Sequence, residues 1–224
     1  MANQEDEKKV GKEDNKPEER SDKKSGEKKK KHPFTQWGAK VLHEPTKAIE
    51  ESYLKTPEFR EITKRMIEKL KDTGWGLAAN QIGLPLKMTL VWIEPIPKHP
   101  EFPPLPPTFL INPEILERSK EMQYGWEGCL SCPGVRFFVP RAKWIKVKYM
   151  NQNGEHITQK AENLWAVLFE HEIDHLYGHV CGERVMTIEG KVVSGGIMSD
   201  YEYFKDPRKI PPGAAHIVKR KDAQ

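Results

Sequence analysis

Apolar residues recur every three or four positions between residues 56 and 74, which is the spacing of one face of an α-helix. Thr56 is suited to the N-cap, Pro57 to the first turn and Gly74 to the position beyond the end. The pattern predicts an amphipathic helix that packs on the core through one stripe, made of Phe59, Ile62, Met66, Ile67 and Leu70.

The middle of the chain has the pattern of β-strands. Residues 88–94 are apolar and β-branched, which predicts a buried strand, and residues 94–107 contain seven prolines that should form a surface excursion outside the sheets. Further on, Ile145, Val147 and Tyr149 alternate with lysines and precede Asn153-Gly154, which is typical of a hairpin with one buried face.

A second helix is predicted over residues 162–178, because Leu164, Val167, Leu168 and Leu176 repeat at helical spacing and Gly178 supplies a stop. The strands therefore cluster between helices without regular βαβ alternation. This order favours an α+β fold in which small, mainly antiparallel sheets wrap around a central C-terminal helix.

Composition divides the 224 residues into a domain and two tails. The formal net charge is +4, but residues 1–31 hold 11 Lys or Arg, 9 Asp or Glu and only three apolar residues. Three apolar side chains bury too little surface to offset the entropy lost when this segment is ordered. We therefore expect a disordered charged tail. We place the domain at residues 32–205 and a C-terminal tail at residues 206–224. Neither a membrane span nor a secretory signal is evident, so we expect an intracellular protein without a membrane partner.

The second predicted helix contains the motif His171-Glu172-Ile173-Asp174-His175. Two imidazoles one turn apart can ligate one metal ion, and the glutamate between them can act on a water bound to it. Three sets of remaining ligands are compatible with this motif. Cys181 would complete a site like that of metzincin proteases, Cys129 with Cys132 would close a structural zinc site, and Cys129 alone would leave one position open for water.

Three motifs together favour the last of these sets. Residues 127–131 (EGCLS), residues 74–81 (GWGLAANQ) and residues 171–176 (HEIDHL) occur in the order and approximate spacing of the peptide deformylases. The chain resembles that family from Trp37 to Thr187. The resemblance implies a metal-dependent hydrolase that removes the formyl group from the N-terminal methionine of new polypeptides and releases formate.

The resemblance also assigns roles to single residues. It implies that Cys129, His171 and His175 hold one divalent metal ion, Fe²⁺ or Zn²⁺, with Co²⁺ or Ni²⁺ as further options. Glu172 would be the general base and acid, and Gln81 would bind the oxyanion together with the backbone N–H of Leu130. The residues expected to bind substrate are Gly74, Trp75, Gly76, Leu77, Glu127 and Gly128.

Four residues near these motifs, or within them, have expected roles or depart from the family pattern. Arg136 follows the cysteine motif and is expected to hold the ligand loop by pairing with Glu127, or else to form a plain surface salt bridge. Trp75, Trp126 and Glu170 depart from the common family pattern. Glu170 is expected to act on the site through its charge rather than by direct contact.

Partners and location are expected from function. The substrates would be N-formyl-methionyl nascent peptides, with the ribosome as a further partner through the basic tail, and the protein is expected to be a monomer. Residues 131–141 and the proline-rich stretch resemble the organellar branch of the family, which implies a mitochondrial location. The acid-rich N-terminus is unlike a transit peptide, so the cytoplasm is the alternative. A metal-stabilised binding module is the non-enzyme alternative.

Overall fold

The computed structural model describes residues 32–97 and 102–215, and the predicted N-terminal tail lies outside them. In this part of the chain, five short 3-10 helices accompany the larger elements, at Lys40–Leu42, Glu51–Lys55, Ala79–Ile82, Cys181–Arg184 and Pro212–Ala214. The α-helices and strands are α1 (Pro57–Leu70), β1 (Gly76–Ala78), β2 (Met88–Ile93), β3 (Leu105–Arg118), β4 (Met122–Cys129), β5 (Cys132–Ala142), β6 (Trp144–Met150), β7 (His156–Glu162), α2 (Leu164–Leu176), β8 (Thr187–Ile188), β9 (Lys191–Val192), β10 (Ile197–Ser199) and α3 (Asp200–Lys205).

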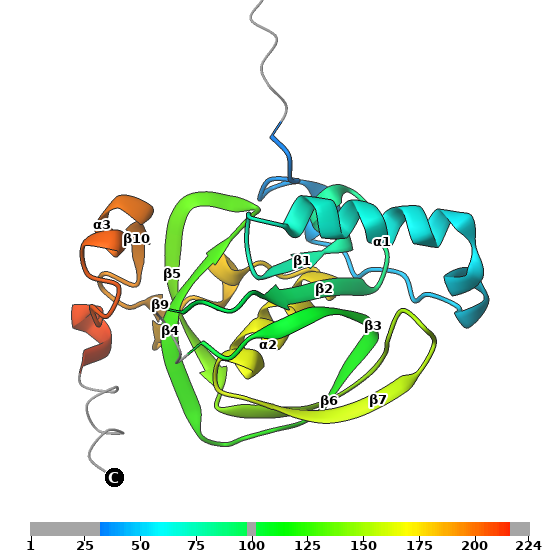
Figure 1. The fold of residues 1–224 in the computed structure, drawn as a ribbon. Coiled ribbons are helices and arrows are strands. Elements are labelled where there is room, and N and C mark those ends of the chain that lie inside the picture. Colours follow the sequence, from blue (N-terminus) through cyan, green and yellow to red (C-terminus); the bar gives the residue numbers. More distant parts are fainter. Residues whose placement is uncertain (1–31, 98–101, 216–224) are drawn as a thin grey trace, which may run out of the picture. The chain divides into compact units, whose positions relative to one another are not determined.

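Among the described residues the strands form three antiparallel sheets, two of which pack on α2 (Figure 1). The largest has the order β1-β2-β3-β6-β7, the second has the order β10-β5-β4, and β8 pairs with β9. Helix α2 packs against β1, β2 and β7 of the first sheet and against β5 of the second. The predicted α+β fold, with small antiparallel sheets around the helix that carries the His-Glu motif, is confirmed.

Helix α1 begins as predicted and ends earlier. The Thr56 side chain accepts a hydrogen bond from the Phe59 N–H at 3.2 Å, and Pro57 occupies the first turn. Four residues of the predicted stripe are buried and Ile67 is half-buried. The helix stops at Leu70 because Lys71 leaves the helical conformation and Asp72 takes a positive φ, so Gly74 lies in the following segment.

The hairpin predicted around Asn153-Gly154 is also present. Strands β6 and β7 pair from Trp144 with Glu162 to Met150 with His156, and Gly154 has a φ of +87° in the turn. On this hairpin Ile145 and Val147 are fully buried. These two side chains pack against the central helix through residues such as Phe169 and Ile173.

The prediction that the prolines stay outside the sheets was wrong at its C-terminal end. Strand β3 begins at Leu105 and so includes Pro106 and Pro107. Both prolines fall where the β2–β3 register shifts, between the pairs Ile93–Leu105 and Val91–Thr108. A register irregularity of this kind leaves backbone N–H groups outside the ladder, so prolines are tolerated there. Residues 98–101 lie outside the described residues.

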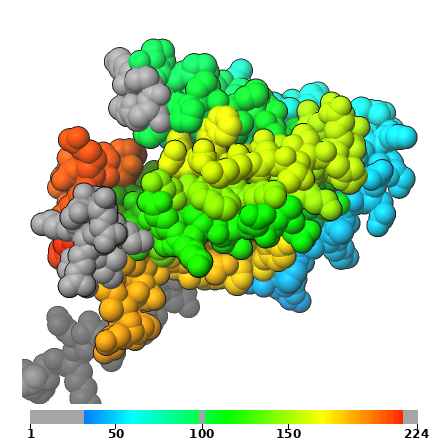
Figure 2. All heavy atoms as spheres, turned by 90° about the horizontal axis from the view of Figure 1, so that it is seen from below, coloured from blue at the N-terminus to red at the C-terminus, as the bar shows by residue number. Residues whose placement is uncertain are grey.

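The segment expected to be a C-terminal tail is partly packed on the domain. Ile210 and the buried Ala214 contact the cluster of Phe138, Met186 and Val193. In the space-filling view the orange-red C-terminal residues lie at the opposite end of the domain from the cyan residues of the α1 region (Figure 2). Among the described residues, no helix is long and apolar enough to cross a membrane.

Candidate metal centre

The hydrophobic face of α2 places two histidines inside the protein. Phe169 and Ile173 are buried against the large sheet, which fixes the rotation of the helix. His171 and His175 then lie one turn apart, with ring centroids 5.2 Å from each other, and both are buried. Glu172 between them is 3% exposed. An imidazole pair in this position is available to a metal ion and shielded from bulk water.

Cys129 reaches the histidines from the end of β4, where the chain turns into β5. Its Sγ lies 3.3 Å from His175 Nε2, and the ligand atoms of Cys129, His171 and His175 all lie within 4.8 Å of one another. One ion with bonds of roughly 2.0–2.3 Å to nitrogen and sulfur can therefore contact all three. The donor set and its spacing fit a single divalent metal ion.

The other two cysteines do not belong to this ligand group. Cys132 and Cys181 are buried and pack beside Cys129 in a small apolar cluster. In the part of the chain that the structure describes, the group with metal-ligand spacing holds Cys129 and neither of its neighbours. The alternatives with Cys181 as the third ligand or with a closed Cys2His2 site are therefore not supported.

The surroundings of Cys129 favour its thiolate form, which is the form that binds metal. Hydrogen bonds from the thiols of Cys132 and Cys181 hold the pKa of Cys129 well below its usual value, although burial opposes them. Two further donors point at the sulfur, because Gln81 Nε2 and the Ser131 N–H each lie 3.4 Å from Sγ.

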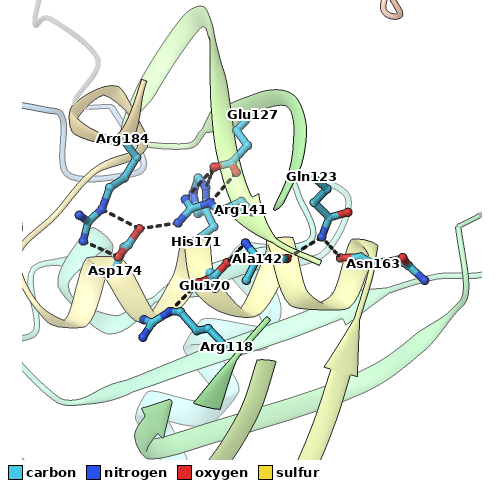
Figure 3. Close-up of polar contacts among 10 residues, drawn as sticks. All are labelled: Arg118, Gln123, Glu127, Arg141, Ala142, Asn163, Glu170, His171, Asp174 and Arg184. Atoms are coloured by element: carbon cyan, nitrogen blue, oxygen red, sulfur yellow. Dashed lines mark hydrogen bonds and ion pairs between the residues drawn. The ribbon is translucent and has the colours of Figure 1, made fainter. Parts of the chain in front are cut away.

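A buried charged network orients His171 (Figure 3). Glu127 Oε2 lies 2.8 Å from His171 Nδ1, which leaves the other ring nitrogen for the metal. Arg141 donates to both oxygens of Glu127, at 2.7 and 2.9 Å, and to Asp174 Oδ2 at 2.6 Å. Burial alone would raise the pKa of Glu127, but the charge and hydrogen bonds of Arg141, with a hydrogen bond from His171, lower it to about 2.

Of the two expectations for Arg136, the pairing with Glu127 was wrong, and Arg136 instead forms a half-buried salt bridge elsewhere. Arg141 occupies that place, while Arg136 Nε donates to Asp200 Oδ1 at 2.6 Å. The two arginines lie five residues apart on β5, so they project to opposite faces of the sheet, and only the face of Arg141 is turned toward α2. Sequence gave no means of choosing between them without the register of β5.

Glu172 is held next to the ligands by a neighbour that sequence reasoning missed. Its Oε2 lies 3.2 Å from Thr89 Oγ1, a buried hydroxyl on β2 that is also 3.1 Å from the Leu77 carbonyl. On the other side, a Cβ at Gly76 would overlap the Glu172 carboxylate. Burial raises the pKa of Glu172, and the charges of His171 and His175 lower it in part. Thr89 is a single hydroxyl residue in an otherwise apolar strand, and this was the one feature of the sequence that could have indicated its role.

Glu170 does not contact the ligands. Its two oxygens accept hydrogen bonds from Arg118 Nε and from the Ala142 N–H, each at 2.9 Å (Figure 3). Glu170 therefore connects α2 to β3 and to the end of β5, which is a contact that fixes the helix. Its predicted action through charge alone stays a prediction.

A cavity of about 560 Å³ opens beside the metal ligands. It lies between β1 and β4, and each of these strands pairs on one side only in the described sheets. Two predicted residues do not line it, because Leu77 is fully buried in the core and His175 is covered. The predicted site residues that line it are Gly74, Trp75, Gly76, Gln81, Glu127, Gly128, Cys129, Leu130, Arg136, His171 and Glu172.

Comparisons with known proteins agree with this geometry. A family described as polypeptide deformylase matches residues 31–191. "Peptide deformylase 1" of Bordetella pertussis is 40% identical over 134 residues, which is 59% of this chain and 76% of that protein. The Met-Ala-Ser-bound crystal structure of a class I type b peptide deformylase from Acinetobacter baumannii matches with a TM-score of 0.65 and 33% identity, covering 68% of this chain and 97% of that one. The peptide deformylase structure from Thermotoga maritima gives a TM-score of 0.61 at 32% identity, covering 70% and 98%.

Proposed function

The chain belongs to the polypeptide deformylase family, and from this premise we propose how its site removes the formyl group from an N-terminal formyl-methionine and releases formate. The proposal rests on one observation, which is that the metal ligands and a buried carboxylate lie side by side. Cys129, His171 and His175 come within metal-ligand distance beside the buried carboxylate of Glu172, at a cavity flanked by two unpaired strand edges. A metal-dependent hydrolase that acts on a small amide uses a bound divalent ion and a nearby general base.

Cys129, His171 and His175 would hold the ion. A divalent ion bound there supplies Lewis acidity and lowers the pKa of a bound water. Glu172 then accepts the proton of the attacking water and delivers a proton to the departing amine nitrogen. The Thr89 hydroxyl and the backbone of Gly76 confine the Glu172 carboxylate beside the metal ligands, where it can make both proton transfers.

The developing oxyanion requires hydrogen-bond donors. Gln81 is 1% exposed, its Oε1 accepts from the Ala78 N–H at 2.9 Å, and its Nε2 faces Cys129 Sγ and Ser131 Oγ. Because the oxygen of the amide is already engaged, its NH₂ group points toward the metal ligands. We assign Gln81, with the Leu130 backbone N–H, to stabilise the negative charge on the formyl oxygen.

The substrate fits the cavity as an extended peptide. The unpaired edges of β1 and β4 face the cavity through Gly76 and Gly128, and an inserted strand can hydrogen-bond to both. Trp75, Leu164 and Leu168 line the cavity with apolar surface suited to a methionine side chain. The related Acinetobacter baumannii structure was solved with Met-Ala-Ser bound, which supports a peptide of this kind as ligand.

The identity of the metal belongs to this proposal. One thiolate and two imidazoles suit Zn²⁺ by affinity and also bind Fe²⁺, Co²⁺ or Ni²⁺ according to availability. Metal analysis of protein purified without oxygen should find about one equivalent of Fe²⁺ or Zn²⁺. The metal should be lost in Cys129→Ser and kept in Cys132→Ser and Cys181→Ser. Loss of metal only in Cys181→Ser would contradict the ligand assignment.

We place the protein where translation begins with formyl-methionine. The mitochondrion is the proposed location, supported by the resemblance of residues 131–141 to organellar members, and the cytoplasm is the alternative. The relatives described above are bacterial. A monomer that meets the ribosome through its basic N-terminal residues completes the proposal. Imaging of a tagged chain and co-sedimentation with ribosomes test these two points.

The deciding experiment measures formate release. The metal-loaded protein should release formate from formyl-Met-Ala-Ser and leave acetyl-Met-Ala-Ser intact, because the larger acetyl group adds a methyl at the reacting carbon. The peptide bonds after methionine should stay whole. Cleavage inside unmodified peptides would indicate a protease instead, and metal binding without any hydrolysis would indicate a binding module.

A further inference from the structure

The C-terminal segment of residues 197–209 forms one wall of the cavity, through Asp200 and Tyr203. It lies beyond the residues that match the family, which end at 191. Strand β10 pairs with β5 through Met198–Arg136 and Ser199–Val135, which places α3 beside β5 (Figure 1). Asp200 and Tyr203 of α3 line the same cavity as the metal ligands. This chain therefore adds side chains to the site from outside the family-matched region.

The segment fixes Arg136 over the β4 edge. Asp200 Oδ1 accepts from Arg136 Nε at 2.6 Å, and the guanidinium carbon lies 5.0 Å from the centre of the Tyr203 ring. A Cβ at Gly128 would overlap Arg136 Nη1, so the guanidinium lies directly on the backbone of that glycine. Gly128 precedes the ligand Cys129, so a positive charge is held beside the path of an inserted peptide.

The same segment holds a second lining residue. Trp126 Nε1 donates to the Lys209 carbonyl at 2.7 Å, and the Trp126 ring packs edge-on against Phe138 at 5.2 Å. Trp126 lies three residues before Cys129 on β4, which in a strand is about 10 Å along the chain. Arg136, Trp126 and Tyr203 thus border the stretch that two or three residues following the formyl-methionine would occupy.

We propose that this wall, which rests on the proposed deformylase function, selects substrates by the residues that follow formyl-methionine. Tyr203 supplies apolar contact for a side chain downstream of the methionine. Asp200 neutralises Arg136, so the wall accepts acidic and basic peptides alike. Asp200 acts through Arg136 and is a positioning residue, whereas Tyr203 is a specificity residue.

The charge of the wall is tested with Asp200→Asn. Formate release is measured from formyl-Met-Ala-Glu-amide and from formyl-Met-Ala-Lys-amide, so that no terminal carboxylate interferes. Because Arg136 and Asp200 are half-buried, loss of the pair should have an effect of about threefold to fivefold, so the variant should raise the ratio of kcat/KM for the Glu peptide over the Lys peptide by that factor. The change should lie in KM and diminish at high salt. An unchanged ratio would overturn the role of Asp200.

The contact with the peptide is tested with Tyr203→Ala. For this variant kcat/KM for formyl-Met-Ala-Leu-amide should fall about threefold to tenfold relative to that for formyl-Met-Ala-amide, mainly through KM, because only the longer peptide has an apolar side chain that can contact the Tyr203 ring. Tyr201→Ala is the matched control, since Tyr201 lies on the same helix, is 72% exposed and does not line the cavity. For Tyr201→Ala, the ratio of kcat/KM between the longer and the shorter peptide should equal that of the parent protein.

The outcomes separate this inference from the function on which it rests. If the parent protein releases no formate from formyl-Met-Ala-amide, the proposed function is wrong and the inference falls with it. If formate is released but kcat/KM depends on peptide length in the same way for Tyr203→Ala and Tyr201→Ala, the deformylase function stands. The wall then does not select substrates by the residues after formyl-methionine. Circular dichroism of each variant shows whether a change in KM arises from misfolding. The Tyr203→Leu variant, which keeps an apolar side chain at this position, should retain more of the length dependence than Tyr203→Ala.

Discussion

At the scale of single residues, Glu172 has a position that separates catalysis from metal binding. It stands between two metal ligands on α2, yet its carboxylate is directed to Thr89 and to the backbone of Gly76. Glu170, two residues earlier on the same helix, is also buried but pairs with Arg118 and the Ala142 N–H. The two carboxylates therefore offer a matched comparison.

The first prediction concerns Glu172→Gln. The amide keeps the size of the side chain but cannot accept a proton, so kcat should fall by roughly two to four powers of ten, the range of general acid–base catalysis. The variant should keep its full metal content because Glu172 is not a ligand. Stopped assays for formate and elemental analysis of the same sample give both values.

Glu170→Gln is the control for that experiment. It should change turnover by far less, because its partners lie away from the ligands, while the protein loses some stability with the Arg118 pair. If instead Glu172→Gln turned over normally and Glu170→Gln did not, the general base would have to be reassigned. Loss of metal from Glu172→Gln would make Glu172 a structural residue.

A second prediction concerns Gly76→Ala. A Cβ at this position would overlap the Glu172 carboxylate, so the carboxylate must move and kcat should fall by at least an order of magnitude, since proton transfer depends on hydrogen-bond distance. At Gly74, by contrast, a Cβ would meet only the Leu130 side chain at 3.6 Å, which is ordinary contact. Gly74→Ala should therefore keep more of kcat, although it lines the cavity. Equal losses in kcat would mean that the space beside Glu172 is not the reason.

At the scale of elements, α2 is fixed by ion pairs as well as by its apolar face. Arg141 on β5 connects β4 and α2 because it binds Glu127 and Asp174 together. Arg184 also binds Asp174, but its side chain is 43% exposed whereas that of Arg141 is 6% exposed. The difference in burial predicts a difference in energy.

The third prediction compares Arg141→Leu with Arg184→Leu. Removing Arg141 leaves the buried Glu127 without its cation, which should lower the free energy of unfolding by about 3–5 kcal/mol. Removing Arg184 should cost only about 0–1 kcal/mol, because an exposed pair is screened by water. Urea unfolding of the metal-loaded variants measures both. Similar losses for the two would show that burial does not decide the strength of these pairs.

The fourth prediction concerns pH. The pKa of Glu127 is lowered from 4.5 to about 2 in the folded protein, so its ionised form stabilises the fold at every pH above the unfolded value. This contribution should be lost as the pH falls from about 4.5 toward 2, where Glu127 takes up a proton in the folded state as well. The difference in unfolding free energy between the parent protein and Glu127→Gln should shrink as the pH falls over that range. A difference independent of pH would contradict the lowered pKa.

At the scale of the whole molecule, the described cavity is built from residues that begin at His32. A chain that starts at residue 32 should therefore hydrolyse formyl-Met-Ala-Ser with kcat and KM within about twofold of the full chain, which is the fifth prediction. The reason is that residues 1–31 hold only three apolar side chains and supply none of the assigned ligands. Formate release by the two chains, at matched metal content, is the measurement. A large loss of turnover in a folded truncated chain would move the domain boundary.

Local sequence determined several of the elements and part of the chemistry. Thr56 and the stripe from Phe59 to Leu70 gave α1 with its N-terminus, because capping and helical periodicity are properties of neighbouring residues. The hairpin at Asn153-Gly154 followed from turn residues in the same way. The two histidines and Glu172 were evident from their spacing on one helix. The resemblance to a family added Cys129 to this group.

Only the tertiary structure decided which distant residues meet. Arg141 rather than Arg136 binds Glu127, because the register of β5 determines which arginine faces α2. Thr89 reaches Glu172 across 83 residues of sequence, and Asp200 reaches Arg136 across 64. Pairings of this kind depend on sheet register and on the packing of α2, which arise from the whole core at once. Short-range periodicity carries no information about them, so they became visible only in the folded chain.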